Sequence, residues 1–299
     1  MAKHNPYSVK IELARGCTRR CPFCTLSTIN WKDDAWQFIK VELFEEICAD
    51  LATWCPKVRI EMDERGEPSF HPKLLELFSI ARKHLPKAQL CMISNGDMID
   101  KKKDKKVYKQ WVQSMFDNGL NVLIFDCYET ERLELMKKVI PQAIIYGNDK
   151  SQTSPWTYTS PKRRDIYLLP GFLFNQDITR KIRNQGGNVD VIKSAVEGFV
   201  QHSSVEAMAD KMCTRPFREL VIHSDGTIPL CCDDWRQEGK VGVYGKDIRS
   251  LKKAWYTSLN KYRKNLINHD RTKQSPCKNC NTPNGFRSGL EMAWFAKEK

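Results

Sequence analysis

The chain has 299 residues, 41% of them hydrophobic, which allows a full buried core in one large domain or in a large and a small one. Its formal net charge of +13 attracts polyanions such as nucleic acids, although solvated helix faces explain such a charge equally well. No run approaches the roughly 18 apolar residues of a membrane helix, and the N-terminus lacks a signal-peptide pattern, so we expect a cytoplasmic protein without membrane contact.

Short apolar runs alternate with longer helical patterns in the first half of the chain, which is typical of βαβ units around a parallel sheet. We expect strands at residues 8–13, 57–62, 88–93, 121–125 and 142–146. Helices with an apolar stripe are expected at residues 41–54, 72–84, 105–118 and 129–139. Right-handed crossovers would roll these units into a barrel or partial barrel.

The pattern breaks down after Tyr146, where prolines and basic residues predict loops or an irregular hairpin that covers a site. A second unit begins near residue 204, with cysteines at both of its ends. It contains a turn at Asp225-Gly226 and a predicted helix at residues 248–265. We therefore predict one domain at residues 1–203 and a second, Cys-rich α+β domain at residues 204–299.

Twelve cysteines occur in the chain, clustered at close spacing. A secreted disulfide framework would explain so many, but no export signal accompanies them, so metal ligation is the better explanation. Cys17, Cys21 and Cys24 follow the first predicted strand. Three thiolates can hold three irons of a [4Fe-4S] cube and leave the fourth open to chelate S-adenosylmethionine (SAM), whose cleavage by one electron releases a 5'-deoxyadenosyl radical. Zinc is the alternative, but it prefers four ligands in a closed tetrahedron.

This cysteine spacing, Cys-x3-Cys-x2-Cys, resembles the defining motif of the radical SAM superfamily, including the aromatic Phe23 before the last cysteine. The resemblance implies an α/β fold built on a partial (β/α)6 barrel of the TIM type, with Phe23 beside the adenine of SAM. It also implies an enzyme, an oxidoreductase or isomerase, that abstracts a hydrogen atom from a substrate carbon. An external reductant of the flavodoxin or ferredoxin type would supply the electron.

Two further segments stand in the order typical of that family. Arg65-Gly66-Glu67-Pro68 resembles the Gly-Gly-Glu-Pro segment that meets the SAM amino group, with Arg65 in place of the first glycine. Ser94-Asn95-Gly96 resembles the family's Thr-Asn-Gly turn. Each is ordinary turn chemistry alone, but both follow predicted strands, where barrel enzymes build their sites. We therefore assign Gly66, Glu67, Pro68, Ser94 and Asn95 to SAM binding.

Other polar residues are candidates for the same site. Asp126 follows the fourth predicted strand and is expected to accept hydrogen bonds from the SAM ribose, with a strand-end cap as the alternative. Cys127 could donate a hydrogen atom, although a small core residue explains it better. Residues 184–188 resemble an Asn-Arg-Gly-Gly stretch found near SAM in some relatives, which makes Asn188 a candidate; a simple turn explains the segment nearly as well.

Four late cysteines, Cys213, Cys231, Cys277 and Cys280, suit either zinc or a second iron-sulfur cluster. Their Cys-x12-Gly-x4-Cys and Cys-x2-Cys spacings resemble the SPASM/twitch extension of radical SAM enzymes. The match is to the shorter type with one auxiliary [4Fe-4S] cluster, found in 2-deoxy-scyllo-inosamine dehydrogenase. Ligation by all four would leave no open iron, which implies an electron conduit or a structural cluster. Cys232 could substitute for its neighbour.

The reaction stays open at this point. An auxiliary cluster that takes the substrate electron gives oxidation, whereas a substrate radical that rearranges gives isomerisation. The positive charge favours a nucleic-acid base or nucleotide as substrate, for example a modified thymidine in DNA, with phosphate contacts from residues 101–109 and 162–164. A zinc scaffold that binds nucleic acid without catalysis is a third hypothesis. The pocket candidates, chosen by position, are Trp156, Tyr158, Tyr167 and Asp233.

Overall fold

The computed structural model describes residues 4–28, 36–99, 105–147, 152–170, 180–189, 199–201 and 203–283. Residues 101–104 of the predicted phosphate-contact stretch lie outside these ranges. Within them, none of the helices has both the length and the apolar character that crossing a bilayer requires.

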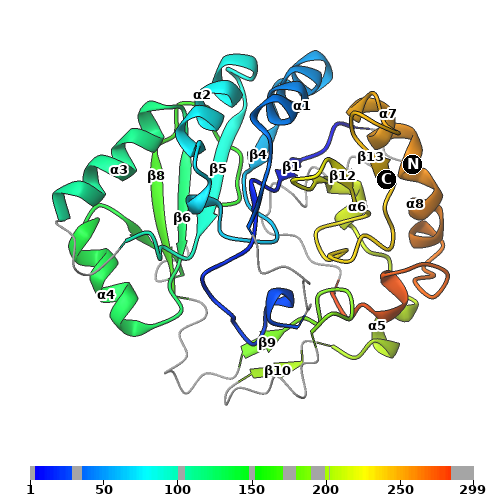
Figure 1. Ribbon diagram of the computed structural model, residues 1–299. Coiled ribbons are helices and arrows are strands. Elements are labelled where there is room, and N and C mark those ends of the chain that lie inside the picture. The colour runs from blue at the N-terminus through cyan, green and yellow to red at the C-terminus, as the bar shows by residue number, and fades with distance from the viewer. Residues whose placement is uncertain are drawn as a thin grey trace.

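A seven-stranded sheet forms the centre of the molecule, in the order β11-β1-β4-β5-β6-β8-β7, and every neighbouring pair is parallel (Figure 1). Its strands are β1 (Ser8–Ile11), β4 (Arg59–Glu61), β5 (Gln89–Ser94), β6 (Val122–Asp126), β7 (Ile144–Ile145), β8 (Asp165–Leu169) and β11 (Glu219–Ile222). The α/β class and the partial TIM-type barrel predicted from the sequence are therefore confirmed.

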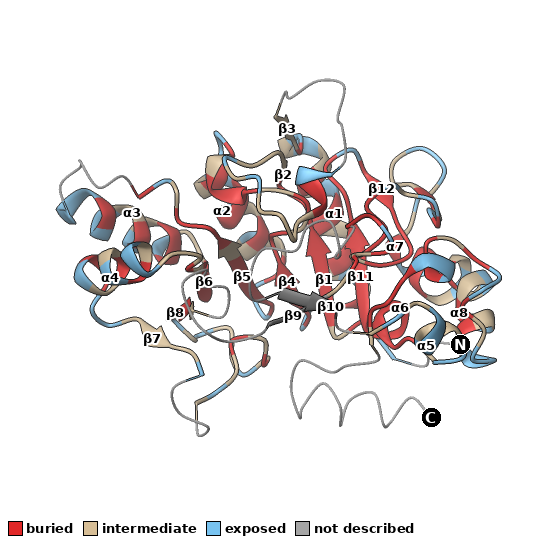
Figure 2. Cartoon of the chain, turned by 90° about the horizontal axis from the view of Figure 1, so that it is seen from below, coloured by how far each residue is buried: buried red, intermediate tan, exposed pale blue. Residues whose placement is uncertain are grey.

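Four helices connect the strands and cover the outer face of the sheet: α1 (Val41–Trp54), α2 (Leu74–His84), α3 (Lys105–Asp117) and α4 (Thr130–Val139). Each buries one apolar stripe, such as Phe44, Ile47 and Leu51 of α1, and turns its polar side to solvent (Figure 2). All four follow the predicted helices to within two residues at each end.

The two faces of the sheet differ because side chains alternate along a strand. Val9, Ile60 and Leu123 point outward and join the large core beneath the helices. A second, smaller apolar cluster, which includes Val122, Ile124 and Tyr167, forms from the alternate residues of β6 and β8. Towards β1 and β4 the corresponding alternate positions are charged, so the inside of the barrel changes from apolar to polar across the sheet.

The region after Tyr146 differs from the prediction of loops, because it contains β8 between β6 and β7. Trp156 and Tyr167 belong to the smaller apolar cluster, and the Tyr158 hydroxyl donates a hydrogen bond to the Lys87 carbonyl at 2.9 Å. These three aromatic residues therefore serve packing, and none of them lines the cavity described below.

The C-terminal part contributes β11 to the main sheet, where it pairs with β1 along residues 8–11. The boundary near residue 204 stays a prediction, but the sheet takes strands from both sides of it. The remaining C-terminal elements are α5 (Glu206–Ala209), α6 (Arg215–Arg218), α7 (Leu251–Lys253), a π-helical turn (Ala254–Ser258), α8 (Asn260–Ile267) and a 3-10 turn (Cys277–Asn279). The predicted Asp225-Gly226 turn lies between β11 and β12, and Gly226 has a positive φ of 81°.

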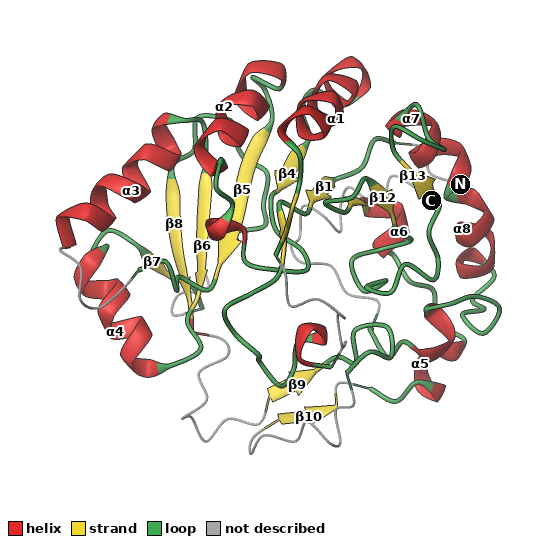
Figure 3. Cartoon of the chain, in the orientation of Figure 1, coloured by secondary structure: helices red, strands yellow, loops and turns green. Residues whose placement is uncertain are grey.

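Three two-stranded sheets surround the main one (Figure 3). They are formed by β2 (Ala14–Arg15) with β3 (Gln37–Phe38), β9 (Arg180–Ile182) with β10 (Phe199–Gln201), and β12 (Thr227–Ile228) with β13 (Gly242–Val243). Two short 3-10 turns, Thr25–Ser27 and Pro68–Phe70, complete the part of the chain that is described. Both follow predicted site segments directly.

Candidate active site

A cavity of about 300 Å³ lies at the carboxyl ends of β4, β5 and β6 and is closed on one side by the C-terminal part of the chain. Most of the predicted site residues line it, namely Cys17, Cys21, Phe23, Cys24, Gly66, Glu67, Ser94, Asn95 and Asp126. Asp233, a pocket candidate by position, lines it as well. Segments that are more than 200 residues apart in the sequence thus meet at one site.

The three thiols of the N-terminal loop are half-buried on the wall of this cavity. Burial raises the pKa of Cys21 to about 12 and that of Cys24 to about 11, and neighbouring thiols add to both shifts. In the absence of a metal cation, these two groups are therefore neutral thiols at neutral pH. A metal cation removes such a proton outright. Three sulfur donors on one open wall fit a cluster that keeps one iron accessible.

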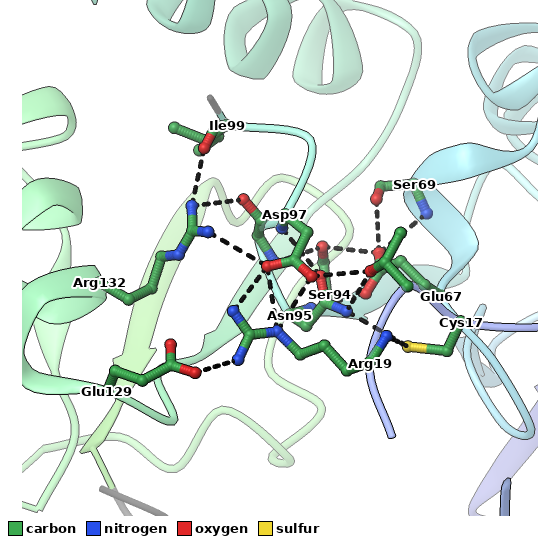
Figure 4. Close-up of polar contacts among 12 residues, drawn as sticks. Cys17, Arg19, Glu67, Ser69, Ser94, Asn95, Asp97, Ile99, Glu129 and Arg132 are labelled. Carbon is green, nitrogen blue, oxygen red and sulfur yellow. Dashed lines mark hydrogen bonds and ion pairs between the residues drawn. The ribbon is translucent and has the colours of Figure 1, made fainter. Parts of the chain in front are cut away.

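Ion pairs hold the cysteine loop against the barrel (Figure 4). Arg19, inside the cysteine motif, donates to Asp97 at 2.7 Å and to Glu129 at 2.5 Å. Arg132 donates to Asp97 from the opposite side at 3.1 Å and to the Ile99 carbonyl at 2.7 Å. The loop is thereby tied both to the segment after β5 and to the start of α4.

Cys17 is the thiol with the most direct polar contacts. Its Sγ accepts hydrogen bonds from Asn95 Nδ2 at 3.3 Å and from the Arg19 backbone N–H at 3.4 Å (Figure 4). Hydrogen bonds to a cluster sulfur stabilise its negative charge and raise the reduction potential. The predicted SAM residue Asn95 therefore also contacts the predicted cluster ligand.

Glu67 is buried and oriented by several donors. Its carboxylate accepts hydrogen bonds from Ser94 Oγ and from the Asn95 backbone N–H, both at 2.7 Å, and from the Ser69 hydroxyl at 2.5 Å. Burial raises the pKa of Glu67, while these hydrogen bonds lower it. Pro68 begins the 3-10 turn that Glu67 caps, so its role in the structure is to shape this segment.

Close packing explains the glycine in the same segment. A Cβ on Gly66 would lie 2.3 Å from the Ala14 carbonyl oxygen and 2.5 Å from that of Gly16, so a larger residue cannot fit there. The Glu67 backbone N–H donates to the Gly16 carbonyl at 2.8 Å. Arg65, which replaces the first family glycine, binds the Glu12 carboxylate at 2.5 Å and the Trp235 carbonyl at 2.9 Å. Arg65 thus connects the segment to the C-terminal part.

The other predicted residues have different positions. Asp126 lines the cavity and accepts a hydrogen bond from the Tyr128 hydroxyl at 3.3 Å, and burial raises its pKa to about 7. Cys127 lies on the opposite face, fully buried in the outer core, where its thiol donates to the Phe125 carbonyl. The alternative of a small core residue therefore fits Cys127 better, because the alternation along the strand directs it away from the cavity.

Asn188 does not line the cavity, but its segment contacts both cysteine regions. Gln185 accepts hydrogen bonds from the backbone N–H and hydroxyl of Thr25, next to Cys24, at 3.0 and 2.6 Å. Asn184 donates to the Asn279 carbonyl at 2.7 Å, next to Cys280. Asn188 supports this turn by donating to the Gln185 carbonyl at 2.7 Å. The segment at residues 184–188 is thus a bridge between the two regions.

The four late cysteines, Cys213, Cys231, Cys277 and Cys280, are all buried and line a second, smaller cavity. Burial raises the pKa of Cys213 to about 11 and that of Cys277 to about 12. Across the described ranges, no group of three or more His, Cys, Asp or Glu side chains is positioned to hold a single metal ion. Four thiols around a cavity fit a [4Fe-4S] cube, because the four cysteine sulfurs that bind a cube lie further apart than the four that bind one zinc ion.

Arg215 and Asp233, whose side chains pair at 3.3 Å, line both cavities. The two cavities therefore share a wall. Cys232, the alternative to a late ligand, is on the other side of that wall: it lines the larger cavity, and its sulfur accepts a hydrogen bond from Arg215. The structure therefore places Cys232 apart from the four late cysteines.

Several lining residues were not predicted from the sequence, namely Lys10, Arg19, Asp63, Glu64, Tyr128, Arg183, Arg215 and Trp235. The sequence contains one signal for a polar wall. Lys10 in β1, and Arg59 and Glu61 in β4, are charged residues at alternate positions of buried strands. A period of two places such residues together on one face.

The predicted phosphate contacts at residues 162–164 precede β8, at the end of the barrel opposite the cavity. Arg163 binds Asp165 and Tyr167 inside the protein, and Arg164 pairs with Asp117 at 3.5 Å. Lys105, Lys106 and Lys109 are exposed on α3. Phosphate contacts by these residues stay a prediction.

Residues 11–142 match the radical SAM superfamily, and residues 213–281 match the SPASM iron-sulfur cluster-binding domain. A search of curated proteins found no match in sequence. The fold is similar to the crystal structure of BtrN in complex with AdoMet and 2-DOIA, with a TM-score of 0.66, 20% identity, and coverage of 93% of this chain and 94% of that one.

A second similar structure is native anSMEcpe with bound AdoMet, with a TM-score of 0.52 and 14% identity over 88% of this chain and 84% of that one. At these identities the likeness establishes the fold alone. Together with the two family matches, it shows that the chain belongs to the radical SAM superfamily, with a C-terminal SPASM domain, and is an enzyme that uses SAM and a [4Fe-4S] cluster to generate a 5'-deoxyadenosyl radical.

Proposed function

We propose that this enzyme oxidises a substrate carbon by two electrons. The substrate C–H bond breaks and its hydrogen atom joins the 5'-deoxyadenosyl radical, which forms 5'-deoxyadenosine. The substrate radical then loses a proton to a cavity carboxylate and an electron to the C-terminal cysteine site. The observation that carries this proposal is the wall of Arg215 and Asp233 that the two cavities share.

Cys17, Cys21 and Cys24 would hold the first [4Fe-4S] cluster, and Cys213, Cys231, Cys277 and Cys280 a second, auxiliary one. The first, when bound and reduced by an external donor of the flavodoxin or ferredoxin type, would supply the electron that cleaves SAM. The chain's own contribution is positioning, because the Arg19 and Asp97 pair and the packing of Gly66 fix the cysteine loop beside the SAM residues.

Glu67 would accept the SAM amino group, because its carboxylate is already oriented by Ser94 and Asn95. Asp126 would accept a ribose hydroxyl beside Tyr128, and Phe23 would contact the adenine. The remaining wall, formed by Lys10, Glu64, Cys232 and Trp235, is left for the substrate.

Isomerisation is the alternative outcome, in which the substrate radical rearranges and no electron leaves. The shared wall favours oxidation, because a nearby acceptor removes the electron before a hydrogen atom returns. A nucleic-acid substrate stays a prediction, and strong salt dependence of substrate binding would support it. A zinc scaffold without catalysis conflicts with the family, whose members carry the [4Fe-4S] cluster.

Anaerobic reconstitution with iron, sulfide, SAM and a reductant tests the proposal. We expect about eight irons per chain from two cubes and formation of 5'-deoxyadenosine. Deuterium should pass into 5'-deoxyadenosine from a labelled substrate, and the product should carry two hydrogens fewer than the substrate. A product with the mass of the substrate would contradict oxidation and establish isomerisation.

A further inference from the structure

The inner wall of the cavity near β1 and β4 carries more carboxylates than cations. Lys10 Nζ lies 3.0 Å from Asp63 Oδ1, 3.1 Å from Glu61 Oε2 and 3.6 Å from Glu64 Oε2. Arg59 pairs with Glu61 at 3.0 Å. Two cations and three carboxyl groups are therefore in contact in this part of the wall.

Asp63 and Glu64 are the two members of the group, besides Lys10, that line the cavity. Their side chains are only 10% and 4% exposed. Asp63 Oδ2 is buried and has no hydrogen-bond partner in the described part of the chain. Leaving such an atom unpaired is costly, so a ligand that donates to it would gain affinity.

The backbone at Glu64 supports the same conclusion. Its φ of 140° lies in the region that favours glycine, yet the chain keeps a long acidic side chain there. Backbone strain of this kind is concentrated at ligand sites, where a side chain must point in a set direction. Burial, followed by the negative charges nearby, raises the pKa of Glu64 to about 8, so binding of a cation would favour its ionised form.

Two guanidinium groups near this part of the wall are already paired. Arg215 lies between Asp233 at 3.3 Å and Glu219 at 3.9 Å. Arg65 pairs with Glu12 at 2.5 Å. Both are therefore bound to carboxylates other than Asp63 and Glu64.

We propose that Asp63 and Glu64 bind a cationic amine of the substrate at this end of the cavity. The inference rests on the proposed function, because it places the substrate in the cavity that also holds SAM. A hydroxyl group could donate to Asp63 Oδ2, but a cation also favours the ionised form of Glu64 beside it. The residues Asp63 and Glu64 thus give this end of the cavity an acidic character, whereas the chain as a whole has a formal net charge of +13.

The test measures binding of isobutylamine, isobutanol and isobutyrate to the reconstituted, SAM-loaded enzyme without reductant, by saturation-transfer NMR at pH 7. The three probes share one carbon skeleton and differ in charge. We expect isobutylamine to bind about tenfold more tightly than isobutanol, and isobutyrate to bind most weakly. Asp63→Asn and Glu64→Gln should each reduce the preference for the amine to about twofold or less.

Lys10→Gln should act in the opposite direction and strengthen amine binding severalfold, because it removes the competing cation. If Lys10, Asp63 and Glu64 had only a structural role, all three substitutions would weaken amine binding. Glu134→Gln, which removes an exposed carboxylate on α4, is the control for net charge. Equal binding of amine and alcohol to the parent enzyme, or equal effects of Asp63→Asn and Glu134→Gln, would overturn the proposal.

Formation of 5'-deoxyadenosine separates this proposal from the proposed function. Asp63→Asn is therefore compared with the parent enzyme for SAM affinity and for amine binding. A tenfold loss of SAM affinity in that variant, with unchanged amine binding, would assign Asp63 to SAM and overturn the inference. Failure of the parent enzyme to cleave SAM would overturn the proposed function and still leave the amine preference measurable.

Discussion

The two cysteine regions use the same side chain in different surroundings. Cys17, Cys21 and Cys24 are half-buried on the wall of a cavity of about 300 Å³ that has room for a cofactor and a substrate. The four late cysteines are buried around a small cavity of their own. The comparison teaches that the number of thiols and the space beside them decide whether a cluster performs chemistry or only carries electrons.

We call the surroundings of Cys17, Cys21 and Cys24 the open region, and those of the four late cysteines the closed region. The largest effect is expected from Cys24→Ala, which removes one of the three sulfur donors of the open region. Formation of 5'-deoxyadenosine should fall by at least about 1,000-fold, which corresponds to a rise of about 4 kcal/mol in the activation barrier. Liquid chromatography of anaerobic reactions measures it. Cys48→Ala, a buried thiol of α1, is the matched control. Parental activity in Cys24→Ala would remove the distinction between the two regions.

Cys277→Ala tests the closed region. We expect the variant to lose about four of eight irons and to form no oxidised product, while it still cleaves SAM. Iron analysis and product chromatography measure the two effects separately. If Cys277→Ala stopped SAM cleavage in a folded protein, the closed region would share the role of the open one.

Glu67→Gln sharpens the comparison on the SAM side of the open region. The amide cannot accept hydrogen bonds on its nitrogen, so it conflicts with the donors Ser94 and Asn95 as well as with the SAM amino group. SAM affinity should fall by about tenfold to a hundredfold, in line with the loss of a buried, charge-assisted hydrogen bond. Calorimetry checks this, with Glu76→Gln on the surface of α2 as control.

The smallest effect is expected from Asn95→Ala, which removes the side-chain donor to Cys17 Sγ. The midpoint potential of the first cluster should fall by about 20 to 60 mV, since one net hydrogen bond contributes about 0.5–1.5 kcal/mol. Redox titration monitored by electron paramagnetic resonance measures it. The potential of the auxiliary cluster should not move, and an equal shift of both would show that the effect is not local to Cys17.

Much of the fold could be predicted because local periodicity decides it. Helices α1 to α4 and strands β1, β4, β5, β6 and β7 lie where the apolar pattern placed them. Strand β8 was missed, because prolines and basic residues precede its short apolar run. Strand β11 could be recognised as an apolar run, but its pairing with β1 joins residues about two hundred positions apart, and no local pattern encodes that.

The site divides in the same way. Contiguous motifs such as the cysteine triad, Glu67 and Asn95 were found, because each lies within a few residues of its partners. Arg215 was not found, because only tertiary packing brings it to the cavity. Asp63 and Glu64 were also missed, although they directly precede the Arg65-Gly66-Glu67 segment. The core position of Cys127 follows from the sequence, since it directly follows Asp126 and the alternation along a strand points the two in opposite directions.

The pairing of β11 with β1 has a consequence for protein engineering. A chain cut at the boundary near residue 204 would leave β1 paired only with β4 and open on its other side, and such an edge pairs readily with other chains. A chimera that exchanges the auxiliary region between relatives should therefore be joined at the Asp225-Gly226 turn, so that β11 stays with the sheet it completes.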